Sequence, residues 1–240
     1  MRILIVADVH SNLAAFGAVL IHAGAIDRVW SLGDLVGYGP DPGACIALLR
    51  SYPHVCVVGN HDLAAAGSMG TAEFNPAAAE AAIWTAAHLN DDERAYLKGL
   101  PLTAEEEGFA LVHGSLRDPV WEYLLSAEAA AAHLDRQGTP YGLVGHSHIP
   151  FIFEDARHGL LMQPVVDGAT VELGPTRFVA NPGGLGQPRD ADPRAAYAVL
   201  DTTDRSLTFH RVEYDIALTQ ARMQEAGLPA FLSERLSRGR

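Results

Sequence analysis

Five short apolar runs in this chain each end in side chains that bind metal ions. The runs and their polar ends are 3–7 before Asp8 and His10, 29–33 before Asp34, 55–59 before Asn60 and His61, 109–112 before His113, and 141–145 before His146 and His148. Apolar runs of this length, closed by glycine or polar residues, are typical of buried parallel strands. Ligands of open α/β sheets gather at the carboxyl ends of such strands. We therefore expect these side chains to form one site.

Two of these strand ends carry a pair of donors with the same spacing. Asp8 and His10 are two residues apart, and so are His146 and His148. Residues i and i+2 of an extended segment face the same way, so each pair can reach one cation.

The other donors suit a second cation and a bridge between the two. Asp34 offers a carboxylate that can be shared by cations about 3.5–4 Å apart. Asn60 adds an amide oxygen and His113 an imidazole, and the set contains no thiolate. Nitrogen and oxygen donors of this kind suit Mn, Fe, Zn, Ni or Co, and we take Mn as the first choice.

Taken together, these segments resemble the motifs of the calcineurin-like metallophosphoesterase superfamily. The matching strings, in the same order and at similar spacing, are Asp8-Val9-His10, Gly33-Asp34, Gly59-Asn60-His61-Asp62, His113 and Gly145-His146-Ser147-His148. The superfamily usually has threonine where this chain has Ser147, which is a mild change.

The resemblance implies a role for each matching residue. It places Asp8, His10 and His148 on one metal ion and Asn60, His113 and His146 on the second, with Asp34 bridging. It implies that His61 is not a ligand and protonates or stabilises the leaving oxygen. The nucleophile is then a hydroxide bridging the two ions, which attacks phosphorus in line.

Two departures from the related protein Ser/Thr phosphatases narrow the resemblance. Gly37 stands where those enzymes have the acid that orients the catalytic histidine, and Tyr38 stands where they have an arginine that grips phosphate. This pattern is closer to small bacterial phosphodiesterases of the superfamily. The segment 181–190, from Asn181-Pro182-Gly183-Gly184 to Gln187-Pro188-Arg189-Asp190, also resembles a loop of that group, although for residues 182–184 we favour a turn between strands.

Several neighbouring residues have two readings each. Asp62 could orient the ring of His61 or cap a helix. Asn12 could touch substrate or, as we favour, cap the first helix. Arg117 could clamp a phosphate oxygen or form a surface salt bridge with Asp118 or Glu122.

Four aromatic side chains, including Tyr38, could stack on a nucleobase, although aromatic residues more often fill a core. The others are Trp84, Trp121 and Tyr123.

The first half of the chain alternates between strand and helix patterns. We predict strands near 2–7, 28–32 and 55–58, with helices near 12–23 and 42–50 between them, which is a parallel βαβαβ arrangement. Residues 63–99 read as a helical insertion, with Asn90 suited to start its last helix.

The second half contains shorter strand candidates. After a strand at 109–112 and a helix beginning at Ser126, strands are predicted near 149–154, 159–165, 169–173, 176–180, 195–201 and 206–213, followed by a helical tail at about 216–240. We expect this half to supply a second, more mixed or antiparallel sheet. The predicted fold is α/β (α+β): one domain over 1–240, a four-layer α/β/β/α sandwich of two mixed sheets flanked by helices.

The composition limits the partners that we expect. The net charge of −12 disfavours broad binding to nucleic acid, which requires many basic contacts to phosphate. The first apolar run stops at Asp8, too early for a secretory signal, and no run is long enough to cross a membrane. We therefore expect a cytoplasmic protein without a membrane partner; a homo-oligomer stays open. Cys45 and Cys56 are predicted to be buried, reduced thiols.

The leading hypothesis is a dimetal phosphodiesterase acting on small phosphodiesters or nucleotides. A phosphomonoesterase or a dinucleoside polyphosphate hydrolase is the alternative. A non-catalytic scaffold, like the retromer-subunit-like members of the superfamily, is less favoured because His61 and all seven donor positions are filled.

Overall fold

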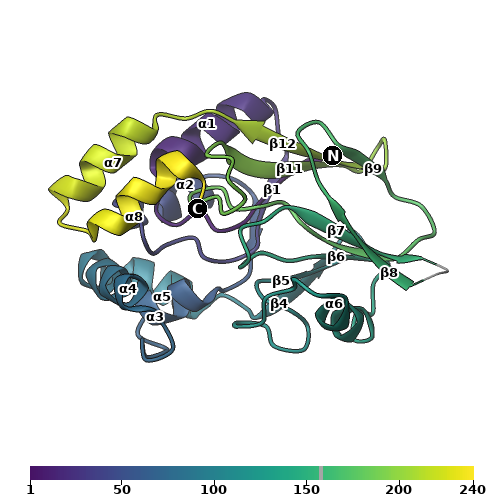
Figure 1. The fold of residues 1–240 in the computed structure, drawn as a ribbon, viewed down its shortest axis with the longest axis horizontal. Helices are drawn as coiled ribbons and strands as arrows, with labels where there is room; N and C mark the ends of the chain where they lie inside the picture. Colours follow the sequence, from purple (N-terminus) through teal and green to yellow (C-terminus); the bar gives the residue numbers. More distant parts are fainter. Residues whose placement is uncertain (157–158) are drawn as a thin grey trace.

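A computed structural model describes residues 1–156 and 159–240, and it contains two six-stranded sheets packed face to face (Figure 1). The first sheet has, in spatial order, β3 (His54–Cys56), β2 (Arg28–Ser31), β1 (Arg2–Val6), β11 (Ala195–Asp201), β12 (Ser206–Val212) and β9 (Thr170–Glu172). The second has β4 (Thr103–Glu106), β5 (Phe109–Val112), β6 (Tyr141–Leu143), β10 (Phe178–Asn181), β7 (Phe151–Ala156) and β8 (Gly159–Pro164).

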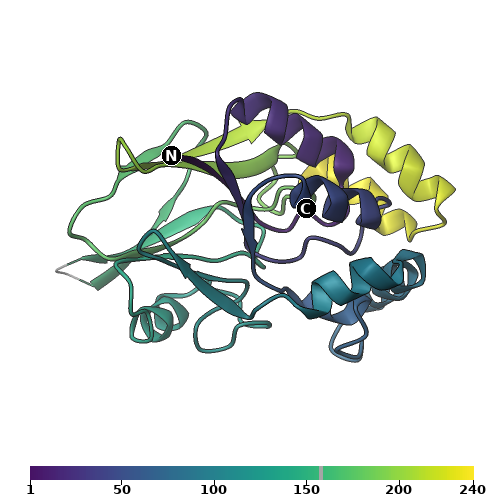
Figure 2. The ribbon, with the colours of Figure 1, turned by 180° about the vertical axis from the view of Figure 1, so that it is seen from behind.

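Helices lie on the outer faces of the sheets and at one end of the molecule (Figures 1 and 2). They are α1 (Leu13–Ala23), α2 (Pro42–Arg50), α3 (Asn60–Ala65), α4 (Pro76–His88), α5 (Asp91–Lys98), α6 (Ala127–Leu134), α7 (Ile216–Glu225), α8 (Ala230–Glu234) and the 3-10 helix η1 (Arg235–Arg238). No helix of the described chain is both long and apolar enough to cross a bilayer.

The apolar side chains of β1 alternate between the two faces of the first sheet. Ile3 and Ile5 pack between the sheets, in the cluster that contains Trp30 of β2 and Phe109 of β5. Leu4 and Val6 point the other way, into the cluster formed with α1 and α2. This period of two follows from the pleat, because successive side chains of a strand face opposite sides.

The outer layers differ between the sheets. Phe16 and Val19 of α1 cover the first sheet, whereas Ala130 and Leu134 of α6 pack on the outer face of the second. The predicted four-layer α/β/β/α sandwich is confirmed by these contacts. Two expected helix starts are also present: Ser126 accepts the backbone N–H of Ala129 at 3.1 Å, and Asn90 accepts that of Glu93 at 2.9 Å.

The pairing of the late strands differs from our expectation. The parallel pairs β1–β2 and β2–β3 are present as predicted. However, β11 pairs antiparallel with β1, with Ile3 opposite Leu200, so β11, β12 and β9 complete the first sheet. The second half therefore supplies a second, mixed sheet as expected, but it also completes the first sheet. This second contribution was not predicted, because pairing between strands almost 200 residues apart leaves no local signal.

Candidate metal centre

The predicted donors lie at the carboxyl ends of strands from both sheets. Asp8 and His10 follow β1, Asp34 follows β2 and His113 follows β5. The backbone turns sharply at these positions, and φ is positive at five of the seven predicted donors. The values are 55° at Asp8, 48° at His10, 53° at Asp34, 65° at His146 and 59° at His148. Such strain is uncommon outside glycine and tends to cluster at functional sites.

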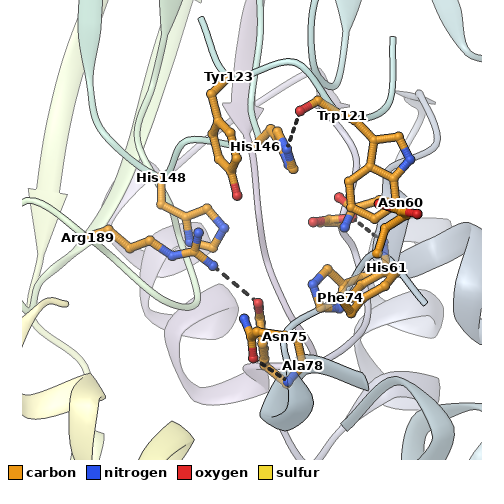
Figure 3. A pocket seen from close by; sticks show the side chains of 13 residues that line it. Asn60, His61, Phe74, Asn75, Ala78, Trp121, Tyr123, His146, His148 and Arg189 are labelled. Carbon is orange, nitrogen blue, oxygen red and sulfur yellow. Dashed lines mark hydrogen bonds between the residues drawn. The ribbon is translucent and has the colours of Figure 1, made fainter. Parts of the chain in front are cut away.

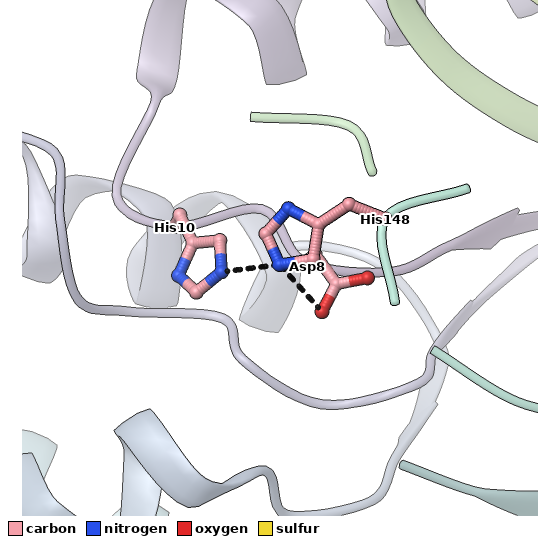
Figure 4. A group of neighbouring side chains, drawn as sticks. All are labelled: Asp8, His10 and His148. Atoms are coloured by element: carbon pink, nitrogen blue, oxygen red, sulfur yellow. Dashed lines mark hydrogen bonds and ion pairs between the residues drawn. The ribbon is translucent and has the colours of Figure 1, made fainter. Parts of the chain in front are cut away.

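The first donor cluster consists of Asp8, His10 and His148 (Figure 4). The Nε2 atoms of the two imidazoles face each other at 3.2 Å, and Nε2 of His148 is 3.5 Å from Oδ1 of Asp8. Nδ1 of His10 donates to the carbonyl of Val36 at 3.1 Å, and Nδ1 of His148 to that of Gln187 at 2.5 Å. Because a neutral ring with a protonated Nδ1 has a lone pair on Nε2, two lone pairs meet here, which a shared cation would satisfy.

The second cluster, formed by Asn60, His113 and His146, repeats this design. Nε2 of His113 is 3.1 Å from Nδ1 of His146 and 3.2 Å from Oδ1 of Asn60. The other ring nitrogens are held by backbone carbonyls, of Leu32 at 2.8 Å and of Trp121 at 3.2 Å. One proton can point at only one of these acceptors, whereas a cation can be shared by all of them.

Asp34 lies between the two clusters. Its Oδ2 is 3.7 Å from Nε2 of His10 and 3.4 Å from Nε2 of His113. Its Oδ1 accepts the backbone N–H of His61 at 2.9 Å, which fixes the carboxylate. The position is that of a carboxylate able to bridge two cations.

The pKa shifts of these buried groups indicate that their carboxylates have too few cationic partners. Burial raises the pKa of Asp8 to about 7, and Asp34 adds to the shift. Oδ2 of Asp8 is buried without a hydrogen-bond partner in the described chain. Burial lowers the pKa of His146 to about 3, whereas the carboxylates of Asp34 and Asp8 outweigh burial at His113 and raise its pKa to about 9. The donor set therefore fits a pair of cations.

His61 lies beside the donors in an aromatic cage. Its ring centroid is 4.3 Å from Tyr38, 4.8 Å from Phe74 and 4.8 Å from His10. Nδ1 of His61 is buried and has no hydrogen-bond partner in the described chain. A Cβ added to Gly37, whose φ is +94°, would lie 2.5 Å from this nitrogen, so the cage leaves no room for the acid found there in protein phosphatases.

Two of the remaining candidates, Asp62 and Asn12, cap helices. Asp62 accepts the backbone N–H groups of Gly59 and Val36, both at 3.0 Å, and caps α3 without bonding the ring of His61. Asn12 accepts the N–H of Ala15 and caps α1.

Arg117 pairs with Glu122 and does not line the cavity over the donors, whereas Tyr38 does. Arg117 therefore forms the ion pair with Glu122 that the sequence offered as one of its two readings.

A cavity of about 80 Å³ opens over the two clusters (Figure 3). Phe74, Trp121 and Tyr123 line it, and Arg189 faces it from the side opposite Phe74 and Trp121. Pockets for drug-sized ligands measure roughly 300–1,000 Å³, so this space suits a phosphate group while the rest of a ligand lies outside.

Sequence reasoning assigned no role to Phe74 or Arg189. Phe74 lies in a loop without a motif. Arg189 follows β10, which pairs parallel with β6, so its loop emerges at the edge that carries His146. Had the strand predicted at 176–180 been paired parallel with the strand before His146, the sequence would have indicated that Arg189 lies near the site.

The comparison with known families agrees with this geometry. A family model described as the calcineurin-like phosphoesterase superfamily domain matches residues 1–205. The chain belongs to this superfamily. The resemblance read from the motifs is thereby confirmed, and the superfamily implies phosphoester hydrolysis.

Three relatives are informative. A metallophosphoesterase structure from Sphaerobacter thermophilus is 44% identical, with a TM-score of 0.92 over 100% of this chain and 99% of that one. An uncharacterized protein of Methanocaldococcus jannaschii is 36% identical over 99% of this chain and 98% of its own. The symmetrical bis(5'-nucleosyl)-tetraphosphatase of Aromatoleum aromaticum is 32% identical over 142 residues, which cover 55% of this chain and 49% of that protein.

Proposed function

We propose that this protein hydrolyses phosphodiester bonds in small molecules or nucleotides with the help of two divalent cations. The observation that carries the proposal is the convergence of imidazole nitrogens on both sides of Asp34. His10 and His148 meet at 3.2 Å on one side, and His113 and His146 meet at 3.1 Å on the other.

Each residue of the site then has a separate role in binding the cations or the leaving oxygen. Asp8, His10 and His148 would hold one cation, Asn60, His113 and His146 the other, and Asp34 both. When bound, the cations would polarise the phosphate and make hydroxide available near neutral pH, and Mn²⁺ is the first choice. His61, which lies between the donors and Phe74, would protonate the leaving oxygen or stabilise it through a ring N–H.

The test combines metal removal with one substitution. Metal-free protein should not turn over bis(p-nitrophenyl) phosphate, and Mn²⁺ should restore turnover. His61→Ala should lower kcat by roughly 10²–10⁴-fold while leaving the metal content unchanged. The control is His88→Ala, on the exposed end of α4. A metal-loaded wild type that turns over no phosphoester would refute the proposal.

A dinucleoside polyphosphate hydrolase is the second candidate. It is favoured by the 142-residue similarity to a symmetrical bis(5'-nucleosyl)-tetraphosphatase. Rates on a monoester, a diester and a dinucleoside polyphosphate, measured side by side, would rank these activities and also test the phosphomonoesterase alternative.

A further inference from the structure

Arg189 faces the cavity over the donors and is held there by two hydrogen bonds (Figure 3). Both come from Nη2, which donates to the hydroxyl of Tyr38 at 3.4 Å and to Oε1 of Gln187 at 3.1 Å. The guanidinium also lies near the face of the Tyr38 ring, with Cζ 5.9 Å from the centroid. The side chain is therefore positioned in advance.

The charge of Arg189 has no carboxylate partner among the described residues. Asp190, next in the chain, pairs with Arg211, and Asp192 pairs with Arg194. Glu73 also lines the cavity but forms no ion pair with Arg189 within 4.0 Å.

Two groups of the guanidinium are unused. Nε of Arg189 is buried without a partner, and within the described ranges Nη1 donates to no other residue. A buried donor left unpaired is costly, so these groups indicate a missing acceptor.

The charge of Arg189 reaches the candidate metal centre. Burial lowers the pKa of His61 to about 4 and that of His148 well below its ordinary value, and the Arg189 charge adds to both shifts. An anion in the cavity would thus meet cations on one side and a guanidinium on the other.

The number of non-bridging oxygens on a phosphate group determines how many contacts Arg189 can make with it. A simple diester has two non-bridging oxygens, one for each cation. A monoester has a third, and a phosphoric anhydride presents those of the neighbouring phosphate. A guanidinium with unused donors gains most from these extra oxygens.

We propose that Arg189 is a specificity-determining residue that binds the phosphate oxygens left uncovered by the two cations. A terminal phosphate or a phosphoric anhydride therefore gains a contact that a simple diester does not, and this contact extends the range of substrates beyond the diesters proposed above. This inference rests on the proposed phosphoesterase function. Tyr38 acts as a positioning residue through its hydroxyl.

The test compares Arg189→Gln with wild type on three substrates. These are p-nitrophenyl phosphate, bis(p-nitrophenyl) phosphate and diadenosine diphosphate. A charge-assisted contact corresponds to roughly 10–150-fold, so kcat/KM should fall by that factor on the monoester, the anhydride or both, and by less than about 3-fold on the diester. A loss on the monoester alone identifies the terminal phosphate, and one on the anhydride alone identifies the neighbouring phosphate. Tyr38→Phe should show a smaller loss with the same selectivity.

Arg136→Gln, which removes the same charge from an exposed position just after α6, is the control and should change none of these rates. Equal losses on all three substrates, or no loss on any, would overturn the assignment.

Calorimetry separates this inference from the proposed function. Arg189→Gln should weaken binding of inorganic phosphate or pyrophosphate to metal-loaded protein by roughly 10–150-fold. That result can be obtained even if wild type turns over no substrate. Unchanged binding of both anions would also overturn the assignment.

Discussion

At the scale of single residues, the orientation of the imidazole rings determines whether the two clusters can bind cations. Four backbone carbonyls each take the N–H of one ring, so the opposite nitrogens aim inward. Sequence reasoning predicted which side chains would gather. It could not predict which ring nitrogen each would present, because the carbonyls that decide this come from distant segments.

Asp34→Asn tests the bridge directly. The amide keeps the size of the side chain but removes the charge shared by both clusters, so affinity for both cations should fall by at least about 10–100-fold. Titration with Mn²⁺ followed by metal analysis measures this. Asp204→Asn, in the exposed turn after β11, should bind like wild type. Loss of only one cation would argue against a shared ligand.

At the scale of elements, the turns after the strands set the site. Most of these strands and helices were predictable from apolar periodicity, including β1, β2 and α1. In contrast, β4 was missed because Thr103–Glu106 is a polar edge strand without alternation of apolar residues. The cage around His61 was also missed, since Phe74 reaches the ring from the loop before α4.

The loop after β2 provides a matched pair of glycine variants. Gly37→Ala would push against His61, and a displacement of this kind can cost about 10²-fold in kcat. Gly67→Ala carries the same backbone penalty, with φ at +74°, but its Cβ meets nothing within 4 Å. Each variant should lose about 1–2 kcal/mol of stability, and only Gly37→Ala should lose turnover. Equal activity in the two variants would contradict the cage.

Helix α6 contributes a pH-dependent term to stability. Nδ1 of the buried His133 accepts the N–H of Leu116, and burial lowers its pKa to about 4. Below its ordinary value of 6.5 the unfolded chain takes up the proton first, so stability present above pH 6.5 is lost as the pH falls towards 4.

His133→Asn should remove this term, because an amide oxygen can accept the same N–H without titrating. Denaturant unfolding between pH 6.5 and 4 should show a loss that is smaller than in wild type by up to about 3 kcal/mol. Parallel curves for the two proteins would rule out this origin.

At the scale of the whole molecule, each cluster joins the two sheets. Asp8 and His10 come from the first sheet and His148 from the second, and likewise Asn60 faces His113. Cations bound here would hold the sheets together and stabilise the folded state alone. Sequence reasoning anticipated the four layers and the shared edge, but not how the late strands divide between the sheets or that the loop after β10 brings Arg189 to the site.

Metal removal should therefore lower thermal stability. Cations at 100 times their Kd contribute about 2.7 kcal/mol per site, which for a chain of this size corresponds to a Tm change of at least about 5 °C. Thermal melts with and without a chelator measure the change, and Mn²⁺ added in excess of the chelator should reverse it.

The most direct test of the central claim is the number of metal ions bound per chain. Protein loaded with Mn²⁺, passed through a desalting column and analysed by mass spectrometry for metal and protein should contain two ions per chain. A ratio near zero or one after loading with Mn²⁺, Fe²⁺, Zn²⁺, Ni²⁺ or Co²⁺ in turn would contradict a binuclear centre at Asp34.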